Sequence, residues 1–204
     1  MPNYQLEMER EIAAITARGD VPRLLLHSCC APCSSYVLET LNPHFAITVY
    51  YHNPNISPKA EFDKRAAEQQ RLIEEMPLIR PVSLVVPDYD NRVFFDAVKG
   101  LESAPEGGAR CAVCYRLRLE DTARYAKENG YDYFTTTLSI SPLKNAALLN
   151  EIGQELGERS GVKYLPSDFK KKNGYLRSCE LSREYGLYRQ DHCGCVFSRR
   201  EKNE

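Results

Sequence analysis

The sequence contains no apolar run that approaches the ~20 residues of a membrane-spanning helix. Its first twenty residues, MPNYQLEMEREIAAITARGD, are charged and lack the apolar region of a secretory signal peptide. These two absences favour a cytoplasmic protein without membrane association. A length of 204 residues suits one domain of ordinary size with a full hydrophobic core.

A glycine-rich phosphate-binding loop is missing as well. Neither the G-x-G-x-x-G pattern nor the P-loop pattern follows the first predicted strand. This absence disfavours an enzyme that binds a dinucleotide in the usual way. Cysteines occupy the place where such a loop would stand, in the stretch LLLHSCCAPCSS from Leu24 to Ser35.

The net charge of the chain is only −1, but the charged residues are unevenly distributed along it. Residues Arg159–Glu204 contain 11 Lys or Arg and 6 Asp or Glu, a net charge of +5, which leaves −6 for the rest of the chain. A basic C-terminal third beside an acidic remainder is typical of a protein with a polyanionic partner. From charge alone, an ordinary solvated surface is the favoured explanation.

Short apolar runs alternate with helical patterns along the chain. Strands are predicted at Val21–His27, Phe45–Tyr51, Val82–Val86, Tyr133–Leu138 and Val162–Leu165. Helices are predicted within Asn3–Arg18 and over Ser34–Asn42, Pro58–Met76, Arg92–Lys99, Ala112–Asn129, Asn145–Arg159 and Glu180–Tyr188. This alternation predicts a single α/β domain over residues 1–204, a three-layer sandwich around a mainly parallel five-stranded sheet. The helix in residues 1–20 would be an added cover, and residues 166–204 a basic C-terminal segment.

Ligands of such sheets bind beyond the C-terminal ends of the strands. The cysteine-rich stretch lies there, and so do HNPN (His52–Asn55), TLSISP (Thr137–Pro142) and SDF (Ser167–Phe169). For HNPN and SISP, ordinary turn chemistry is slightly favoured over substrate contact.

The eight cysteines form three groups. The first is Cys29, Cys30 and Cys33, the second is Cys111 and Cys114 in CAVC, and the third is Cys179 together with the CGC pair Cys193 and Cys195. In a cytoplasmic protein, cysteine clusters more often bind metal or act in catalysis than form structural disulfides. Cys179 alone is well explained as a small buried hydrophobic residue.

A Cys-x-x-Cys pair at the start of a helix lets two thiolates converge on one metal site, because the helix N-terminus favours the thiolate. Arg110 and Arg116 would favour it further. Zinc is the simplest candidate. The side chains of adjacent Cys29 and Cys30 are expected to diverge, which suits the separate irons of an iron–sulfur cluster better than a single ion.

The CGC motif indicates different chemistry. Two thiols separated by one flexible glycine can form a strained disulfide, and strained disulfides are the labile ones that take part in redox reactions. A redox pair at Cys193 and Cys195 is therefore preferred over two further metal ligands.

Four motifs in this order, spread over roughly Arg23 to Ser198, resemble the QueH family of cobalamin-independent epoxyqueuosine reductases. They are HSCCAPC, YYHNPNISPKAEFDKR, CAVCYRLRLEDTARYAKENGYDYFTTTLSISPLKN and YRQDHCGCVFS. The resemblance implies reduction of epoxyqueuosine to queuosine at the wobble position (34) of tRNA, the last step of queuosine synthesis. The fold is then expected to be nucleotide-hydrolase-like (HUP-like) without a nucleotide loop.

The resemblance also implies the cofactor and its ligands. A [4Fe–4S] cluster is expected on Cys29, Cys30, Cys111 and Cys114, with Cys193 and Cys195 as a redox-active disulfide. The position of Cys33 can be Asp in relatives, and either side chain could hold an additional iron. The resemblance assigns no role to Cys179.

The partners follow from the implied reaction. Loss of the epoxide oxygen requires two electrons, an oxophilic Lewis acid and a proton source, so an unidentified electron donor is expected beside the tRNA. The unpaired bases of the anticodon stem-loop can stack on aromatic side chains, and its phosphates can contact basic residues. The candidates named from sequence are Tyr115, Tyr175, Tyr185 and Tyr188 for stacking; Lys170–Lys172 for phosphates; Arg110, Arg116, Arg118 and Arg124 for a second basic face; His27, His52 and His192 as proton donors; and Arg189, Arg199 and Arg200 as cations near CGC.

Two alternatives from other classes remain open on sequence alone. One is an iron–sulfur-dependent tRNA thiolation enzyme with a similar fold, against which the missing nucleotide loop argues. The other is a zinc-stabilised RNA-binding protein without catalytic activity.

Overall fold

A five-stranded parallel sheet forms the centre of the computed structural model, which describes residues 2–198. The strands lie in the order β3–β2–β1–β4–β5. Their bounds are Arg23–His27 for β1, Ala46–Tyr50 for β2, Ser83–Val85 for β3, Tyr133–Thr136 for β4 and Lys163–Tyr164 for β5. The chain reverses its direction of winding between β1 and β4, so the C-terminal ends of these two central strands form the crevice where ligands of such sheets bind.

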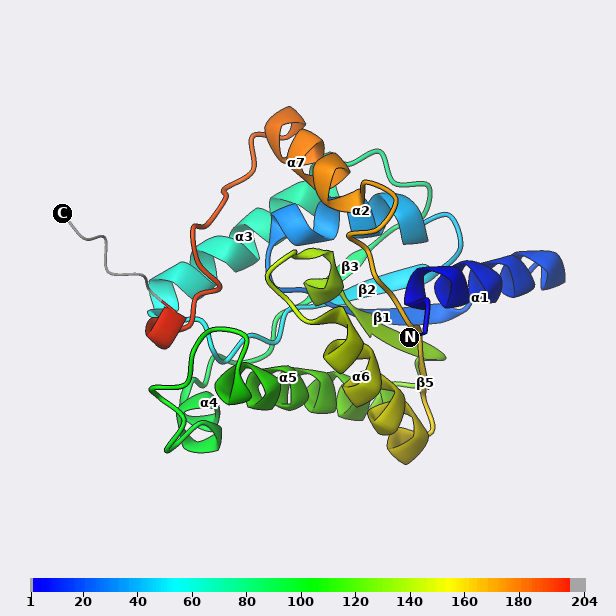
Figure 1. The fold of residues 1–204 in the computed structure, drawn as a ribbon. Coiled ribbons are helices and arrows are strands. Elements are labelled where there is room, and N and C mark those ends of the chain that lie inside the picture. Colours follow the sequence, from blue (N-terminus) through cyan, green and yellow to red (C-terminus); the bar gives the residue numbers. More distant parts are fainter. Residues whose placement is uncertain (1, 199–204) are drawn as a thin grey trace.

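Helices cover both faces of the sheet (Figure 1). One face carries α2 (Ala31–Leu41), α3 (Lys59–Glu75) and α7 (Gly174–Glu184). The other carries α4 (Arg92–Ala97), α5 (Ala109–Glu128) and α6 (Ala146–Ser160). The predicted three-layer α/β architecture is therefore confirmed. Among the helices of residues 2–198, none is long and apolar enough to cross a membrane.

The two faces are built by the alternation of side chains along the strands. Leu24 and Leu26 of β1 point into one apolar core, beside helices α2 and α3, and Leu25 points into the second core, beneath α5 and α6. All three leucines are fully buried. Successive residues of a strand face opposite sides of the sheet, so one short apolar run supplies both cores.

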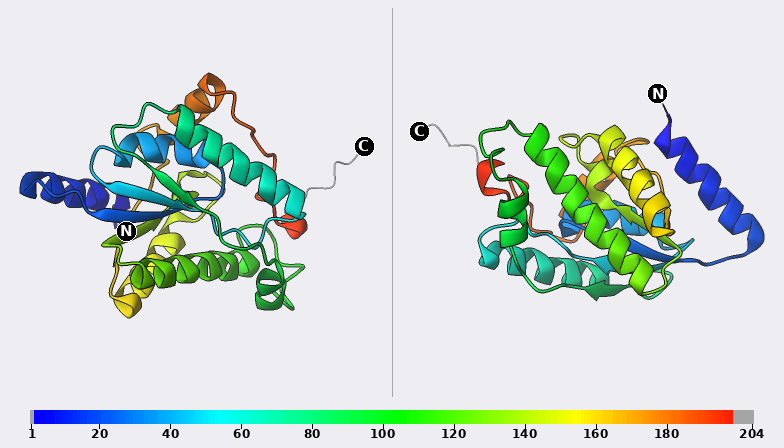
Figure 2. Two further views of the ribbon diagram at one scale, coloured as in Figure 1. Left: turned by 180° about the vertical axis from the view of Figure 1, so that it is seen from behind. Right: turned by 90° about the horizontal axis from the view of Figure 1, so that it is seen from below.

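The first helix, α1 (Tyr4–Arg18), is an added cover, as predicted from the sequence. Its side chains Met8 and Ile15 are buried in the core that also contains Leu24 and Leu26. Asn3 caps its first turn, and Gly19 ends it in the left-handed conformation. Viewed from behind and from below, α1 lies at the opposite end of the molecule from the short turn η2 (Val196–Ser198) that follows the CGC motif (Figure 2).

Several helix boundaries differ from prediction, and the differences matter for the cysteines. Helix α2 begins at Ala31 rather than Ser34, with Cys30 as the N-cap residue and a proline in its first turn. Ser34 lies inside the helix, where its hydroxyl donates to the Cys30 carbonyl at 3.1 Å. Cys33 therefore stands in the first turn of α2, and Ser34 and Ser35 lie inside the helix rather than at its N-cap.

Two other helices also start earlier than predicted. Helix α5 begins at Ala109, so that Cys111 and Cys114 lie in its first turns. Helix α7 begins at Gly174 instead of Glu180 and ends at Glu184 instead of Tyr188. Strand β4 ends at Thr136, because residues Thr137–Ile140 form the 3-10 turn η1.

Candidate thiol-rich active site

The first cysteine group lies at the turn from β1 into α2. The sulfur atoms of Cys29, Cys30 and Cys33 all lie within 4.8 Å of one another, and those of Cys29 and Cys30 are 3.7 Å apart. The expected divergence of these two side chains is therefore wrong. Cys30 is extended, with φ −174° and ψ 159°, at the point where the strand turns into the helix, and this turn brings both sulfurs to one side.

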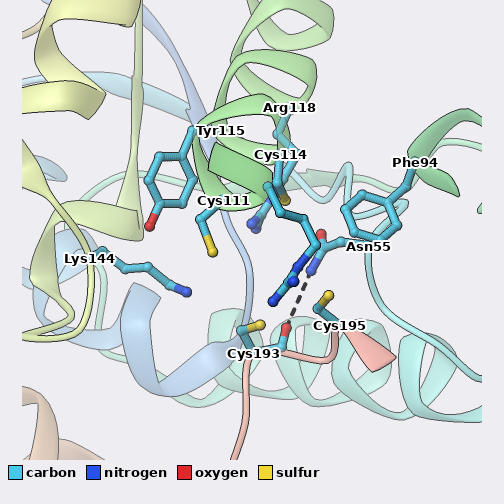
Figure 3. Close-up of a pocket in the computed structure, with 10 residues that line it drawn as sticks. Asn55, Phe94, Cys111, Cys114, Tyr115, Arg118, Lys144, Cys193 and Cys195 are labelled. Carbon is cyan, nitrogen blue, oxygen red and sulfur yellow. Dashed lines mark hydrogen bonds between the residues drawn. The ribbon is translucent and has the colours of Figure 1, made fainter. Parts of the chain in front are cut away.

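The second and third groups meet across a small pocket. Cys111 and Cys114 on α5 line it from one side, and Cys193 and Cys195 of the C-terminal segment line it from the other (Figure 3). In Figure 3 the thiols of Cys111, Cys193 and Cys195 are directed into the space between the two segments. The other lining residues are Asn55, Phe94, Arg110, Tyr115, Arg118 and Lys144.

Arg118 connects the first cysteine group with the other two. It lines the pocket of Cys111, Cys114, Cys193 and Cys195, and its charge acts on the thiols of Cys29, Cys114 and Cys193. Cys29 in turn packs against the apolar cluster that contains Cys111. The structure therefore brings seven of the eight cysteines to the C-terminal edge of the sheet. Cys179 lies apart on α7, where Arg189 interacts with it.

The donor set fits a soft metal centre. All eight cysteines are free thiols, and Cys30, Cys111 and Cys114 are buried. Thiolates select zinc, copper(I) and iron–sulfur clusters over hard cations. Several buried polar atoms around the pocket have no hydrogen-bond partner among the described residues: Asn55 Oδ1, Arg110 Nε, Tyr115 Oη and His192 Nε2. Unpartnered polar atoms are rare in protein interiors and indicate a place where a ligand or bound water completes the structure.

The three thiols of the first group share one negative charge. Hydrogen bonds from Cys30 and Cys33 hold the pKa of Cys29 well below its usual value, and the Arg118 charge lowers it further. The hydrogen bond with Cys29 raises the pKa of Cys30 to about 12, and the corresponding contact raises the pKa of Cys33 as well. Cys29 is therefore the thiolate of this group.

The CGC pair divides its charge in the same way. A hydrogen bond from Cys195 lowers the pKa of Cys193 to about 4, against the effect of burial, and the Lys144 ammonium contributes to this shift. The same hydrogen bond, together with burial, raises the pKa of Cys195 above its usual value. At neutral pH Cys193 is a thiolate and Cys195 a thiol, which is the state from which thiol–disulfide exchange starts.

The backbone around the CGC motif is fixed through its carbonyl groups. The Asn55 amide donates to the Cys193 carbonyl at 3.3 Å (Figure 3), and the backbone N–H of Ser57 donates to the Gly194 carbonyl at 3.1 Å. Arg65 reaches the His192 carbonyl at 3.4 Å, and Arg110 reaches the Phe197 carbonyl at 3.5 Å. These bonds hold the loop while the two thiols remain free to react.

Two buried asparagines of the HNPN segment hold the backbone of the cysteine loops by hydrogen bonds. Asn53 and Asn55 are only 1% and 2% exposed. Asn53 donates to the Ser28 carbonyl at 2.8 Å, next to the first cysteine group. The sequence predicted either a turn or a substrate contact for HNPN. It did not predict that these asparagines hold the cysteine loops in place.

Sequence reasoning also missed the two buried cations of the site, Arg118 and Lys144. Arg118 was assigned to a basic outer face, although Cys111, Cys114 and Arg118 are spaced i, i+3 and i+7, a spacing that places all three on one side of a helix. The Lys144 side chain is 9% exposed, and its ammonium lies 3.8 Å from Glu106. Burial lowers the pKa of Lys144, but the charges of Cys193, Tyr115 and Cys111 outweigh it and the pKa is raised.

The second basic face expected on α5 does not exist. Arg110 and Arg118 are buried. Arg116 pairs with Glu155 at 2.6 Å, and Arg124 pairs with both Asp121 and Glu128. Among the cations expected near CGC, Arg189 interacts with Cys179 instead, and Arg199 and Arg200 lie outside the described residues.

The expected contacts to tRNA are distributed unevenly over the surface. Tyr175 is 41% exposed, whereas Tyr115 is 2% exposed and lines the pocket. Burial raises the pKa of Tyr115 to about 12, so its hydroxyl stays protonated. Tyr188 packs under the Lys64 ammonium at 3.5 Å, and Tyr185 is half-buried on the first core. In the lysine loop, Lys170 pairs with Asp168 and Lys172 pairs with Glu9.

The three histidine candidates differ in their surroundings. His27 is fully buried, and burial together with Arg118 lowers its pKa well below the usual value. Burial also lowers the pKa of His52, although Asp121 lies 3.5 Å from its ring. His192 Nδ1 contacts Asp191 at 2.7 Å, directly before the CGC motif. His27 is therefore a neutral structural residue.

The chain is similar over most of its length to proteins of one named family. Residues 24–201 match the family model described as "Epoxyqueuosine reductase QueH". A protein of that name from Staphylococcus epidermidis is 44% identical over 200 residues, which cover 96% of this chain and 84% of the relative. One from Streptococcus pyogenes is 44% identical, with 97% and 80% coverage. One from Thermotoga maritima is 35% identical, with 89% and 92% coverage.

Proposed function

This chain belongs to the QueH family of epoxyqueuosine reductases, and we propose that it reduces epoxyqueuosine at the wobble position of tRNA to queuosine. The observation that carries the proposal is the meeting of three cysteine groups, from Cys29 to Cys195, at one edge of the sheet inside the segment that matches the family. The similarity to named reductases favours this activity over tRNA thiolation and over RNA binding without catalysis.

The Cys193–Cys195 pair balances the reaction. Both C–O bonds of the epoxide break, a C=C bond forms, and the oxygen leaves as water after taking up two protons. The Cys193 thiolate and the Cys195 thiol supply the two electrons and one proton as they become a disulfide, and the second proton comes from solvent. An external electron donor then returns the disulfide to the dithiol, so one thiol pair can serve many substrate molecules.

A [4Fe–4S] cluster on Cys29, Cys30, Cys111 and Cys114 completes the proposed site, and the Cys33 side chain could hold an additional iron. When bound, such a centre supplies an oxophilic Lewis acid and electron transfer. The chain itself supplies the thiolate at Cys193, the buried ammonium of Lys144 and the protonated hydroxyl of Tyr115 beside it. Lys144 and Tyr115 line the same pocket as Cys193, and these two donors would stabilise a substrate oxygen that gains negative charge there.

The polyanionic substrate requires basic surface near this pocket. Lys171 and Arg183 are exposed. Tyr175, which lies between them in the sequence, is an exposed aromatic residue on α7. We assign the phosphate contacts to this C-terminal region, which carries the net positive charge.

The decisive experiment combines metal analysis with turnover. The full chain, purified without oxygen, is expected to contain about four irons and four acid-labile sulfides and to convert epoxyqueuosine-tRNA to queuosine-tRNA with a chemical reductant. Nucleoside mass spectrometry detects the product. Stoichiometric zinc without sulfide would contradict the proposed cofactor, and consumption of ATP with transfer of sulfur to tRNA would contradict the proposed reaction.

A further inference from the structure

Arg118 is a buried cation whose hydrogen-bond partners other than cysteine are neutral. It is 2% exposed. Its Nη2 donates to Asn53 Oδ1 at 2.5 Å, and its Nε donates to His27 Nε2 at 3.3 Å. Among the residues that the structure describes, no carboxylate forms an ion pair with Arg118.

The charge state of His27 follows from this contact. A guanidinium keeps its protons at all ordinary pH values, so Nε of Arg118 is the donor and Nε2 of His27 is the acceptor. Nε2 of His27 also lies 3.2 Å from the His52 carbonyl, and Nδ1 lies 2.8 Å from Thr136 Oγ1. Burial and the Arg118 charge lower the pKa of His27 well below its usual value. His27 is neutral, and Asn53 carries no charge, so neither partner offsets the positive charge of Arg118.

The other buried arginines are compensated in ways that Arg118 is not. Arg65 forms an ion pair with Glu61 at 2.6 Å. Arg110 donates to the backbone carbonyls of four residues, namely Leu101, Glu102, Ala104 and Phe197. A buried charge without a compensating charge or a full set of polar partners is strongly unfavourable. Arg118 therefore requires an anion. The cysteine sulfurs that act on it are those of Cys29, Cys193 and Cys114, and the Cys114 sulfur is also its hydrogen-bond partner.

We propose that Arg118 is the internal counter-cation of the cysteine site, which compensates the negative charge that the three cysteine groups and their bound cluster accumulate. The inference rests on the proposed function only for the identity of the cluster. Because a one-electron reduction makes a thiolate-ligated cluster more negative by one charge, a fixed cation beside it stabilises the reduced form more than the oxidised form. Arg118 thus raises the reduction potential of the site and makes it accessible to a biological electron donor.

The test is a redox titration of the iron-loaded, full-length protein, followed by electron paramagnetic resonance. At a fixed potential, Arg118→Gln is expected to lower the ratio of reduced to oxidised cluster by about tenfold or more, because it removes the nearby charge. Arg118→Lys keeps the charge and should stay close to the parent protein. Arg116→Gln is the matched control, since it removes the same charge from the outer face of the same helix.

A second variant covers the case in which Arg118→Gln loses its iron. Asn53→Asp has nearly the same shape and places a carboxylate at the atom that accepts from Arg118. It should shift the ratio in the same direction as Arg118→Gln while the arginine is retained. An unchanged ratio in Asn53→Asp, or equal ratios in the Gln and Lys variants at position 118, would overturn the assignment.

Failure of the proposed cofactor is distinguishable from failure of this inference. If the parent protein binds no iron, the cluster is wrong, and the thiolate absorbance of the reduced protein then decides the role of Arg118. In that case Arg118→Gln should carry fewer thiolates at neutral pH than the parent and the Arg116→Gln control, and equal absorbance would refute the counter-cation role.

Discussion

At the residue scale, the two thiols of the CGC motif have unequal surroundings. Cys193 is partly exposed and shares the pocket with the Lys144 ammonium, whereas Cys195 is buried in the small core around Phe94 and Val98. The pKa of Cys193 is lowered to about 4 and the pKa of Cys195 is raised. In the proposed redox pair, Cys193 is therefore expected to be the thiol that attacks or is attacked, and Cys195 the thiol that closes the disulfide.

The first prediction concerns substitution of each thiol. Cys193→Ser and Cys195→Ser should each retain iron and tRNA binding but lose multiple turnover, because a single thiol cannot form the internal disulfide. Nucleoside mass spectrometry with a chemical reductant measures this. Turnover like that of the parent in either variant would refute the redox pair, and loss of iron would show that these cysteines are ligands.

The second prediction concerns pH. Since the pKa of Cys193 is lowered to about 4, its thiolate persists above that value, and its rate of alkylation should stay nearly constant from about pH 8 down to about pH 5. An ordinary cysteine would slow about tenfold for each pH unit below its pKa of ~8.5. Mass spectrometry of reduced protein after short pulses of iodoacetamide locates the label. A tenfold fall per pH unit at Cys193 would contradict the lowered pKa.

At the element scale, the loop that carries CGC is fixed by a close contact with the HNPN segment. Gly194 has φ +93°, and a Cβ atom there would lie 2.8 Å from Cγ1 of Ile56. Only glycine satisfies both the backbone angle and the space. This loop has to place two thiols opposite α5, and its carbonyl groups are held by Asn55 and Ser57.

The third prediction tests this loop. Gly194→Ala should destabilise the protein by roughly 1–3 kcal/mol, from the left-handed backbone and the contact with Ile56, and should reduce turnover. Gly186→Ala is the matched control, because Gly186 also has positive φ, at +55°, but a Cβ atom there would meet no other atom within 4 Å. Thermal unfolding and the turnover assay measure both effects. Equal losses in the two variants would show that the contact with Ile56 is unimportant.

At the scale of the whole molecule, the charge asymmetry of the sequence is reduced by pairing. Three cations of the basic C-terminal third, Lys163, Lys172 and Arg177, pair with carboxylates in the acidic remainder of the chain. Lys171 is exposed, and no ion pair is found for it among the described residues. It is the member of the lysine loop best able to contact a phosphate.

The fourth prediction concerns binding of tRNA. Replacing Lys170–Lys172 by alanine should weaken the affinity for tRNA and reduce its salt dependence, and Lys171→Ala alone should account for a slope change of about one. Lys163→Ala is the control, because Lys163 pairs with Glu11 at 2.7 Å near the opposite end of the sheet. Filter binding at several salt concentrations gives the slopes. A triple variant that binds like the parent at every salt concentration would show that the loop is only a solvated surface.

The sequence by itself determined the architecture and the identity of the reactive groups. Strand periodicity and apolar runs indicate which side chains are buried, so the five strands and the three-layer α/β fold were predictable from the sequence. The position of loops such as Leu24–Ser35 at one edge of the sheet was predictable as well. The family resemblance was equally visible in the cysteine motifs, because it depends on residue identity and order.

Only the tertiary structure decided how the charges and sulfurs are arranged. A short-range pattern did not reveal that the turn into α2 brings the sulfurs of Cys29 and Cys30 to 3.7 Å, nor that Arg118 donates to Asn53 from a distant loop. Charge compensation and burial depend on segments far apart in the chain, such as Asn53 against α5, and local sequence carries no record of those distances. The physical reason is that electrostatic energy depends on separation in space and on the surrounding dielectric, and folding alone sets both.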